Sequence, residues 1–314
     1  MDLSIIIPLY NENESIITLS HEIESVCKKN NLKSEVIFVN DGSTDNSWLK
    51  IKEICGQKFS NVLFRAINFR KNLGKSNALN EGFKYAIGKV VITMDADLQD
   101  NPVEIPKFFH LISNKNFDLV CGWKKNRKDP ISKTMPTKLF NSVTRFFSGI
   151  NLHDFNCGFK AYKLKVVRNI SVSGEMHRYI PLIVKRKGFK NICEIEVNHR
   201  VREHGVSKFG VERFSNGFLD LLTILFLNKF GNRPMHFFGL LGIICFVIGF
   251  CIAVYFSYAK LFLNYYNMTD RPLFFLGILS MIIGSQFFLT GFLAELVIRN
   301  KSEESNEISE KIGF

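Results

Sequence analysis

The first hundred residues alternate between short apolar runs and segments with helical periodicity. The apolar runs cover residues 3–7, 35–39, 61–68 and 90–94. Their length and their β-branched content are typical of buried strands. Between them, apolar residues recur at helical spacing, up to about position 30 after the first run and about position 86 after the third. Strands that alternate with helices predict a parallel sheet with helices packed on its faces.

Polar side chains follow each predicted strand. Asn11 and Glu12 come after the first strand, and Asp41-Gly42 comes after the second and forms a turn signal. Ser43 or Thr44 is expected to cap the helix that follows this turn. In an open α/β sheet, ligands gather at the carboxyl ends of the strands. The sequence therefore predicts a binding crevice at that edge.

The fourth strand ends at Asp95, Asp97 and Gln99. Carboxylate and amide oxygens suit Mg²⁺ or Mn²⁺, which keep coordination positions open for water and substrate phosphates. A solvated acidic turn is the plain alternative, because Asp-x-Asp triplets are common by chance. The sequence leaves this choice open until the rest of the first domain is considered.

Two long apolar segments occupy the C-terminal third. Residues 236–259 and 273–294 contain no Asp, Glu, Lys or Arg. Each is long enough to cross a hydrocarbon core of about 30 Å. The alternative is a pair of buried core helices, which rarely reach this length. The segments therefore predict a two-helix membrane anchor.

Basic residues flank the two spans unevenly. Lys208, Arg213, Lys229 and Arg233 precede the first span, and Arg299 and Lys301 follow the second, whereas the connecting loop carries only Lys260 and Arg271. The positive-inside bias predicts that both termini are cytoplasmic. Residues 211–233 have apolar positions at helical spacing and predict an amphipathic helix in the interface, with a core helix of the soluble domain as the alternative. The charged tail, residues 299–314, is expected to be mobile.

Composition narrows the classes of ligand. The net charge of +12 and the pI of about 9.3 favour anionic lipid or phosphate ligands. Nucleic acid is not expected as a partner, because no zinc-finger spacing or RNP-like motif is present. The seven cysteines are dispersed and contain no C-x-x-C spacing, which predicts reduced thiols that serve as small apolar side chains and not a disulfide frame or a zinc site. His153 and His177 have no partner at ligand spacing, so we expect both to be structural.

Six motifs follow one another over about residues 3–210. They are Pro8-Leu9-Tyr10-Asn11-Glu12, Val39-Asn40-Asp41-Gly42-Ser43-Thr44-Asp45, Asn72-Leu73-Gly74-Lys75, Asp95-Ala96-Asp97-Leu98-Gln99, Asn156-Cys157-Gly158-Phe159-Lys160 and Arg200-Val201-Arg202-Glu203-His204-Gly205-Val206-Ser207-Lys208. This ordered set resembles the family 2 glycosyltransferases, which have the GT-A α/β fold. The branch most similar is the polyprenyl-phosphate one, with its dolichyl-phosphate mannose synthases and bactoprenol glucosyltransferases. The expected organisation is a GT-A domain at 1–210, the amphipathic helix at 211–233, two transmembrane helices within 236–298, and a cytoplasmic tail at 299–314.

The resemblance implies roles for individual residues. Mg²⁺ or Mn²⁺ would be held by Asp95, Asp97 and Gln99. The nucleotide would contact Pro8, Tyr10, Asn11, Glu12, Asp41, Gly74, Lys75 and Asp95. The phosphates would meet Arg127, Arg200, Arg202, Ser207 and Lys208. Lys124 stands where many relatives have arginine, so a bidentate contact there is in doubt and Arg127 is expected to replace it.

Asp154 lies where the family carries its proposed base. A lipid phosphate, with a second pKa near about 6, is already largely a dianion at neutral pH and barely needs a base. We therefore expect Asp154 to orient the acceptor or to stabilise positive charge at the anomeric carbon. Asp97 and Arg127 complete the expected catalytic set.

The predicted function is transfer of one sugar from a nucleotide sugar, with UDP favoured, to polyprenyl phosphate such as undecaprenyl phosphate. The reaction would be metal-dependent and inverting, at the cytoplasmic membrane, and relatives suggest a homo-oligomer. Two alternatives stay open. A processive polysaccharide synthase would need a Gln-x-x-Arg-Trp motif, which is absent. A non-catalytic sugar-nucleotide-binding scaffold would be expected to have lost a carboxylate, yet Asp41, Asp95, Asp97 and Asp154 are all present.

Overall fold

The fold comes from a computed structural model of the chain. It describes residues 1–125, 141–146, 148–172, 174, 176–200, 226, 230–231, 233–262 and 271–301. The chain divides into two compact units, Met1–Leu222 and Thr223–Phe314.

The described part of the first unit contains a seven-stranded sheet in the order β3-β2-β1-β4-β6-β5-β7. Its strands are β1 (Leu3–Leu9), β2 (Ser34–Asn40), β3 (Val62–Asn68), β4 (Val90–Thr93), β5 (Leu119–Trp123), β6 (Lys160–Lys163) and β7 (Ile192–Glu196). Strands β1 to β4 pair in parallel, as the alternation predicts. Strand β6 runs antiparallel to both β4 and β5, so the sheet is mixed.

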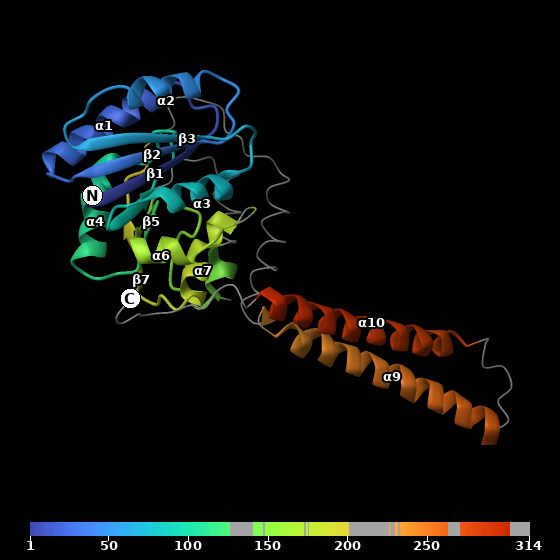
Figure 1. The fold of residues 1–314 in the computed structure, drawn as a ribbon. Helices are drawn as coiled ribbons and strands as arrows, with labels where there is room; N and C mark the ends of the chain where they lie inside the picture. The colour runs from blue at the N-terminus through green and yellow to red at the C-terminus, as the bar shows by residue number, and fades with distance from the viewer. Residues whose placement is uncertain are drawn as a thin grey trace. The chain divides into compact units, whose positions relative to one another are not determined.

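Helices cover both faces of this sheet (Figure 1). They are α1 (Ile16–Lys29), α2 (Ser47–Cys55), α3 (Lys75–Tyr85), α4 (Ile105–Ser113), α6 (Leu164–Asn169) and α7 (Ile180–Arg186), with 3₁₀ turns η1 (Pro102–Glu104) and η2 (Met176–Tyr179). Leu3, Ile5 and Ile7 belong to the same buried cluster as apolar residues of α1, α2 and α4. Ile6 points to the opposite face, where α3 lies so close that a Cβ on Gly82 would be 2.4 Å from the Ile6 side chain. Because successive side chains of β1 point to opposite faces of the sheet, this strand contributes to the apolar core on both faces.

The start of α2 differs from the sequence prediction. Its N-cap position is Asn46, with no side-chain capping bond. Ser43 hydrogen-bonds with Asn40, and Thr44 hydrogen-bonds with Asn11. The prediction that Ser43 or Thr44 caps this helix is wrong, because these hydroxyls join two loops instead.

Strand order reverses between β1 and β4. From β1 the chain moves outward to β2 and β3, and then returns to add β4 on the other side of β1. Such a switch point leaves a crevice outside the carboxyl ends of the two strands. The segments beginning at Tyr10 and Asp95 both leave the sheet at this point.

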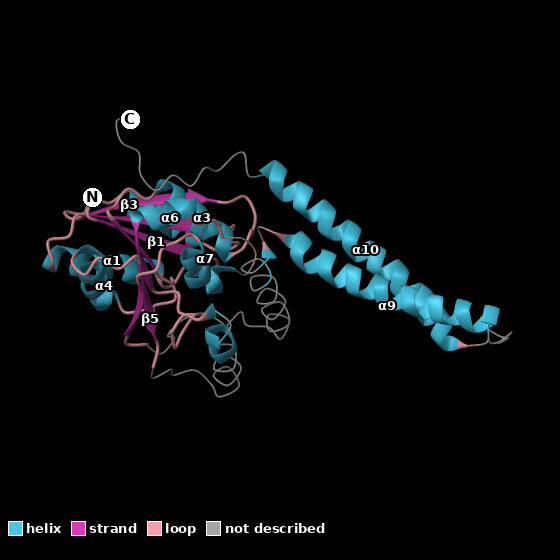
Figure 2. Cartoon of the chain, turned by 90° about the horizontal axis from the view of Figure 1, so that it is seen from below, coloured by secondary structure: helices cyan, strands magenta, loops and turns pink. Residues whose placement is uncertain are grey.

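The second unit contains two long apolar helices, α9 (Pro234–Phe262) and α10 (Pro272–Lys301), which lie side by side (Figure 2). Only 17% and 11% of the residues in their most apolar windows are buried, so neither is the core helix of a soluble domain. Both are long and apolar enough to span a membrane. Most of the predicted amphipathic helix at 211–233, and residues 302–314 of the tail, lie outside the described residues.

Candidate active site

The loops after β1 and β2 are held together by side chains. The backbone N–H of Asn11 donates to Ser43 Oγ at 2.9 Å, and the backbone N–H of Glu12 donates to Ser47 Oγ at 2.9 Å. The Thr44 N–H donates to Asn11 Oδ1 at 2.8 Å. Asn11 has a φ of 54°, in the left-handed region that asparagine tolerates better than most residues. The expected nucleotide residues Tyr10, Asn11 and Glu12 therefore lie on a loop whose backbone is fixed.

Asp41 is buried at the end of β2 and holds a third loop. Its two carboxylate oxygens accept hydrogen bonds from the N–H groups of Leu73 and Gly74, at 2.7 and 2.9 Å. Burial raises the pKa of this carboxyl, although the two backbone hydrogen bonds act in the opposite direction. Asp41 thus fixes the turn at Gly74, directly before α3. This structural task is one that the sequence did not indicate.

The turn after β4 brings together three carboxylates. Asp97 Oδ1 accepts from the Gln99 N–H at 3.2 Å, and Asp100 Oδ2 accepts from the Asp95 N–H at 3.2 Å. Lys124 Nζ lies 2.8 Å from Asp100 Oδ1 in a pair that is almost fully buried. Lys124, for which a bidentate phosphate contact was in doubt, is therefore paired with a carboxylate of this turn.

Asp95 and Asp97 differ in their electrostatic surroundings. Burial alone would raise the pKa of Asp95, but the positive charges of Lys75 and Lys124 outweigh it and hold the pKa low. For Asp97, burial and the negative charges of Asp95 and Asp100 raise the pKa to about 6. Negative charge is therefore concentrated at Asp97, where a cation would relieve it.

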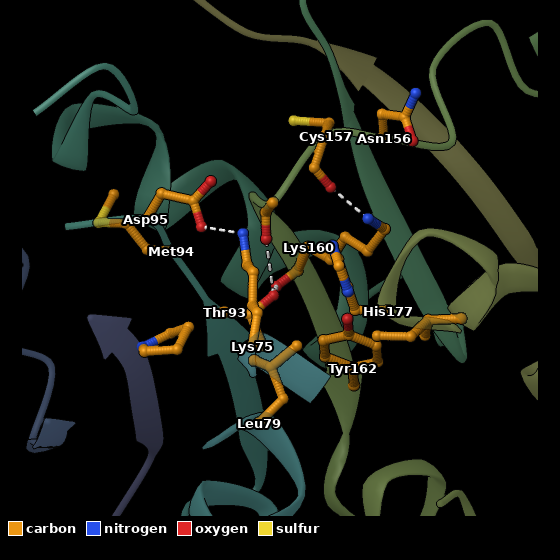
Figure 3. A pocket seen from close by; sticks show the side chains of 13 residues that line it. Lys75, Leu79, Thr93, Met94, Asp95, Asn156, Cys157, Lys160, Tyr162 and His177 are labelled. Atoms are coloured by element: carbon orange, nitrogen blue, oxygen red, sulfur yellow. Dashed lines mark hydrogen bonds and ion pairs between the residues drawn. The ribbon is translucent and has the colours of Figure 1, made fainter. Parts of the chain in front are cut away.

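A pocket lies beside Asp95 (Figure 3). Lys75, at the start of α3, forms an ion pair with Asp95, and both side chains line the pocket. His177 lines another part and has its Nδ1 3.2 Å from Ser76 Oγ. One buried polar atom of a lining residue, Asn156 Oδ1, has no hydrogen-bond partner among the described residues. Such an atom is suited to a bound polar group or an ordered water.

Gly158 lines this pocket and lies against the Asp95 carboxylate. A Cβ at this position would lie 2.6 and 2.7 Å from the two carboxylate oxygens of Asp95. The Gly158 carbonyl accepts from Thr93 Oγ1 at 2.8 Å, which joins the loop to the end of β4. Only glycine allows the chain to approach Asp95 this closely.

Asp154 is buried in the loop that leads into β6. Its Oδ1 accepts from the Asn156 N–H at 3.1 Å. The buried Lys160 donates through Nζ to the carbonyls of Phe155, at 3.2 Å, and Cys157. Lys160 therefore fixes the loop between Asp154 and Gly158 from within the core.

The expected phosphate-binding residues fall into two groups. The Arg200 guanidinium binds Glu22, at 2.8 Å, and Asn101, and its backbone N–H donates to the Gln99 carbonyl at 3.0 Å. These contacts support the turn after β4. Arg127, Arg202, Ser207 and Lys208 lie outside the described residues.

The residues after β4 that we expect to bind a divalent cation, Asp95, Asp97 and Gln99, offer the oxygen donors that Mg²⁺ and Mn²⁺ prefer. Among the described residues, no group of three or more His, Cys, Asp or Glu side chains is arranged to enclose a metal ion. Two carboxylates and the Gln99 amide would leave coordination positions open, as Mg²⁺ and Mn²⁺ sites that bind substrate phosphates do.

Residues 4–171 match the family model described as Glycosyl transferase family 2. The chain belongs to this family. It is 33% identical over 301 residues to the dodecaprenyl-phosphate galacturonate synthase of Rhizobium johnstonii, covering 95% of this chain and 88% of that protein. It is 32% identical to the undecaprenyl-phosphate 4-deoxy-4-formamido-L-arabinose transferase of Pectobacterium atrosepticum, again with coverage of 95% and 88%.

A solved structure with the same fold is the glucosyl-3-phosphoglycerate synthase of Mycobacterium tuberculosis in complex with Mn²⁺, UDP and glucosyl-3-phosphoglycerate. It aligns with a TM-score of 0.55 at 15% identity, over 72% of this chain and 79% of that chain. The expected GT-A fold is confirmed. At this identity the comparison supports the fold alone.

Several residues of the site were not expected from the sequence. His177 was considered structural, yet it lines the pocket and contacts Ser76, which lies 101 positions away. Tyr162 lies on β6, a short strand that no periodicity predicts, and Lys160 belongs to a family motif to which the sequence assigns no role. The one local signal was Gly158, since a glycine inside a loop motif indicates close backbone approach.

Proposed function

We propose that this protein transfers a single sugar from a nucleotide sugar, UDP-linked in our preferred assignment, to the phosphate of a polyprenyl lipid. The observation that carries the proposal is the turn after β4, where Asp95, Asp97 and Gln99 lie at the switch point of a family 2 fold. The polyprenyl-phosphate transferases among the relatives align over 95% of this chain, which includes both apolar helices.

The nucleotide would bind across the ends of β1 and β2. Pro8, Tyr10, Asn11, Glu12 and Asp41 would surround the base and ribose on loops joined by the hydrogen bonds of Asn11 and Ser43. Asp41 uses one lone pair on each oxygen for Leu73 and Gly74, so each oxygen retains capacity to accept from a ligand. Gly74 and Lys75 would face the diphosphate from the start of α3.

A divalent ion held by Asp95, Asp97 and Gln99 would offset the charge on the departing nucleoside diphosphate. Asp95 would keep its negative charge through Lys75. The basic residues Arg127, Arg202 and Lys208, together with Ser207, remain predicted phosphate contacts.

The acceptor phosphate would bind beside Asp154. We expect Asp154 to orient this phosphate or to stabilise charge at the anomeric carbon, with inversion there. The α9–α10 hairpin would anchor the enzyme in the cytoplasmic membrane, with the catalytic unit and both termini in the cytosol, in line with the distribution of basic residues.

The test uses purified full-length protein with Mn²⁺, a short-chain polyprenyl phosphate and a panel of radiolabelled nucleotide sugars. We expect label to enter the organic phase for one donor, and Asp97→Asn to abolish this transfer. Glu53→Gln, on the exposed face of α2, is the matched control and should retain full activity. Label that stays aqueous with every donor would contradict the lipid acceptor.

A further inference from the structure

Asp154 lies in a loop without regular secondary structure, between residue 148 and β6. The position of its carboxylate therefore depends on side chains that hold the loop from outside. After Asp154, Asn141 accepts from the Phe155 N–H and Lys160 binds the Phe155 carbonyl. Before Asp154, the backbone at His153 is held by Glu194, a residue of β7.

Glu194 engages His153 through both of its oxygens. Oε2 accepts from the His153 backbone N–H at 2.7 Å, and Oε1 is within hydrogen-bond distance of Nδ1 of the His153 ring. The Glu194 side chain is only 13% exposed, although its strand lies at the edge of the sheet. Burial of a carboxylate costs desolvation free energy. The hydrogen bonds that Glu194 makes to His153 offset this cost and fix the backbone of the loop.

Trp123 completes the arrangement. It ends β5, the strand next to β7, and its ring stacks on His153 with centroids 4.2 Å apart and an interplanar angle of 15°. The His153 ring is thus fixed by the stacked Trp123 ring on one face and by a hydrogen bond to Glu194 at its edge. We call Trp123, His153 and Glu194 the clasp.

We propose that the clasp is a positioning device for Asp154 and that Glu194 is its principal residue. This inference rests on the proposed function for the role of Asp154. Strands β5 and β7 place Trp123 and Glu194, these two residues fix His153, and His153 sets the backbone directly before Asp154. Glu194 does not touch the reacting groups, so it acts through Asp154.

The chain offers a matched control on the same strand. Glu196 lies two residues after Glu194, is 56% exposed and pairs with Lys125 at 2.6 Å. Glu194→Ala and Glu196→Ala remove the same chemical group from the same strand. Only the first change releases the loop at His153.

The experiment compares both variants with the wild-type full chain in detergent micelles. For Glu194→Ala we expect kcat for transfer to polyprenyl phosphate to fall about 10- to 100-fold, the size of effect expected for a misplaced reacting group. The Kd for UDP with Mn²⁺ should stay within about 2-fold, because the nucleotide site is on other loops. Glu196→Ala should match the wild type in both measurements. A wild-type kcat for Glu194→Ala, or a parallel loss of nucleotide affinity, would overturn the proposal.

Combination with Asp154→Asn separates positioning from general damage. If Glu194 acts through Asp154, the double variant Glu194→Ala/Asp154→Asn should have the same kcat as Asp154→Asn alone. If the two residues act independently, the two losses of kcat would multiply in the double variant, and this result would contradict the proposal. If Glu194→Ala reduces the yield of folded protein, the isosteric variant Glu194→Gln is used in its place. We expect kcat of Glu194→Gln to fall severalfold. A wild-type kcat for this variant would contradict the clasp.

Hydrogen exchange supplies a readout that needs no substrate. Glu194→Ala should speed amide exchange in residues 150–158 and leave residues 90–100 unchanged, and unchanged exchange in both segments would refute the clasp. If the wild-type protein transferred no sugar to lipid, the proposed function would fall, while the exchange result would still report on the clasp.

Discussion

Asp95 and Asp97 lie two positions apart but have opposite surroundings. Lys75 pairs with Asp95, whereas Asp97 faces the negative charges of Asp95 and Asp100. Asp95 therefore stays ionised at any pH of interest, and Asp97 is the first of the two to gain a proton. A bound cation would therefore stabilise Asp97 most, and the charge of Asp97 is the one that changes with pH near neutrality.

The affinity for Mn²⁺ should follow the protonation of Asp97. Its pKa in the metal-free protein is raised to about 6, so the carboxylate is ionised above that pH and competes with a proton below it. We expect Mn²⁺ affinity in the presence of UDP to decline steadily as the pH falls from about 7.5 to about 5. Titration calorimetry across this range measures the effect, and Asp97→Asn should remove the step. Constant affinity over the range would contradict this assignment.

Gly158 should tolerate no side chain. Gly158→Ala would place a Cβ within 2.6 Å of the Asp95 carboxylate, which must then move away from its present position beside Lys75. We expect the affinity for UDP with Mn²⁺ to fall about 10-fold or more. Gly56→Ala is the control, since a Cβ there meets its nearest atom at 3.4 Å. Equal nucleotide affinities in the two variants would show that the contact is unimportant.

Asp154→Asn tests whether Asp154 acts as a base. If Asp154 orients the acceptor, its removal should cost less activity at high pH, where the lipid phosphate is fully dianionic. Transfer rates of the variant and the wild type should converge between about pH 6 and about pH 8.5. A loss that is equally large across this range would instead identify Asp154 as an obligatory base.

At the scale of elements, the α9–α10 hairpin packs backbone against backbone. A Cβ on Gly242 would lie 2.6 Å from the Gly284 carbonyl oxygen, and a Cβ on Gly249 would lie 2.4 Å from that of Gly277. Each pair is seven residues from the next on both helices, so the glycines lie on one face. Small residues drive helix association where no hydrophobic effect operates.

Gly249→Leu should force the two helices apart. The new side chain meets main-chain atoms of α10, which do not move aside as a flexible side chain would. Overpacking of this kind costs about 1–3 kcal/mol, so we expect a lower melting temperature in detergent. Ser257→Leu, at an exposed position of α9, adds a similar volume and should leave the melting temperature unchanged. A Gly249→Leu protein as stable as the wild type would argue against the glycine contact.

At the scale of the whole molecule, the two units differ in the surface that they expose, so one is stable in water and the other in a bilayer. The first has a buried apolar core, whereas the second exposes apolar side chains along both helices. Exposed apolar surface of this extent is stable in a bilayer and not in water.

The protein should therefore stay in membranes after alkaline carbonate extraction and leave them only with detergent. A protein bound by charge alone would be released, because salt and high pH weaken its attraction to anionic lipid. Immunoblots of pellet and supernatant measure the partition. Recovery in the supernatant would exclude the hairpin as a transmembrane anchor.

Local patterns were sufficient for much of this protein. Strands β1 to β4, helices α1 and α3 and the two long apolar helices all follow from periodicity and composition, because each forms from residues close together in the chain. The placement of Asp95 and Asp97 at a crevice also follows, since parallel strands end at a common edge.

Contacts between distant segments needed the tertiary structure. Lys75 with Asp95, Lys124 with Asp100, and His153 with Glu194 join residues from different elements. No local pattern encodes such pairs, because they exist only once the strand order is set and β6 has entered the sheet antiparallel between β4 and β5. Periodicity shows which face of an element is buried, whereas the partner of a buried charge is decided by which strand lies next to it.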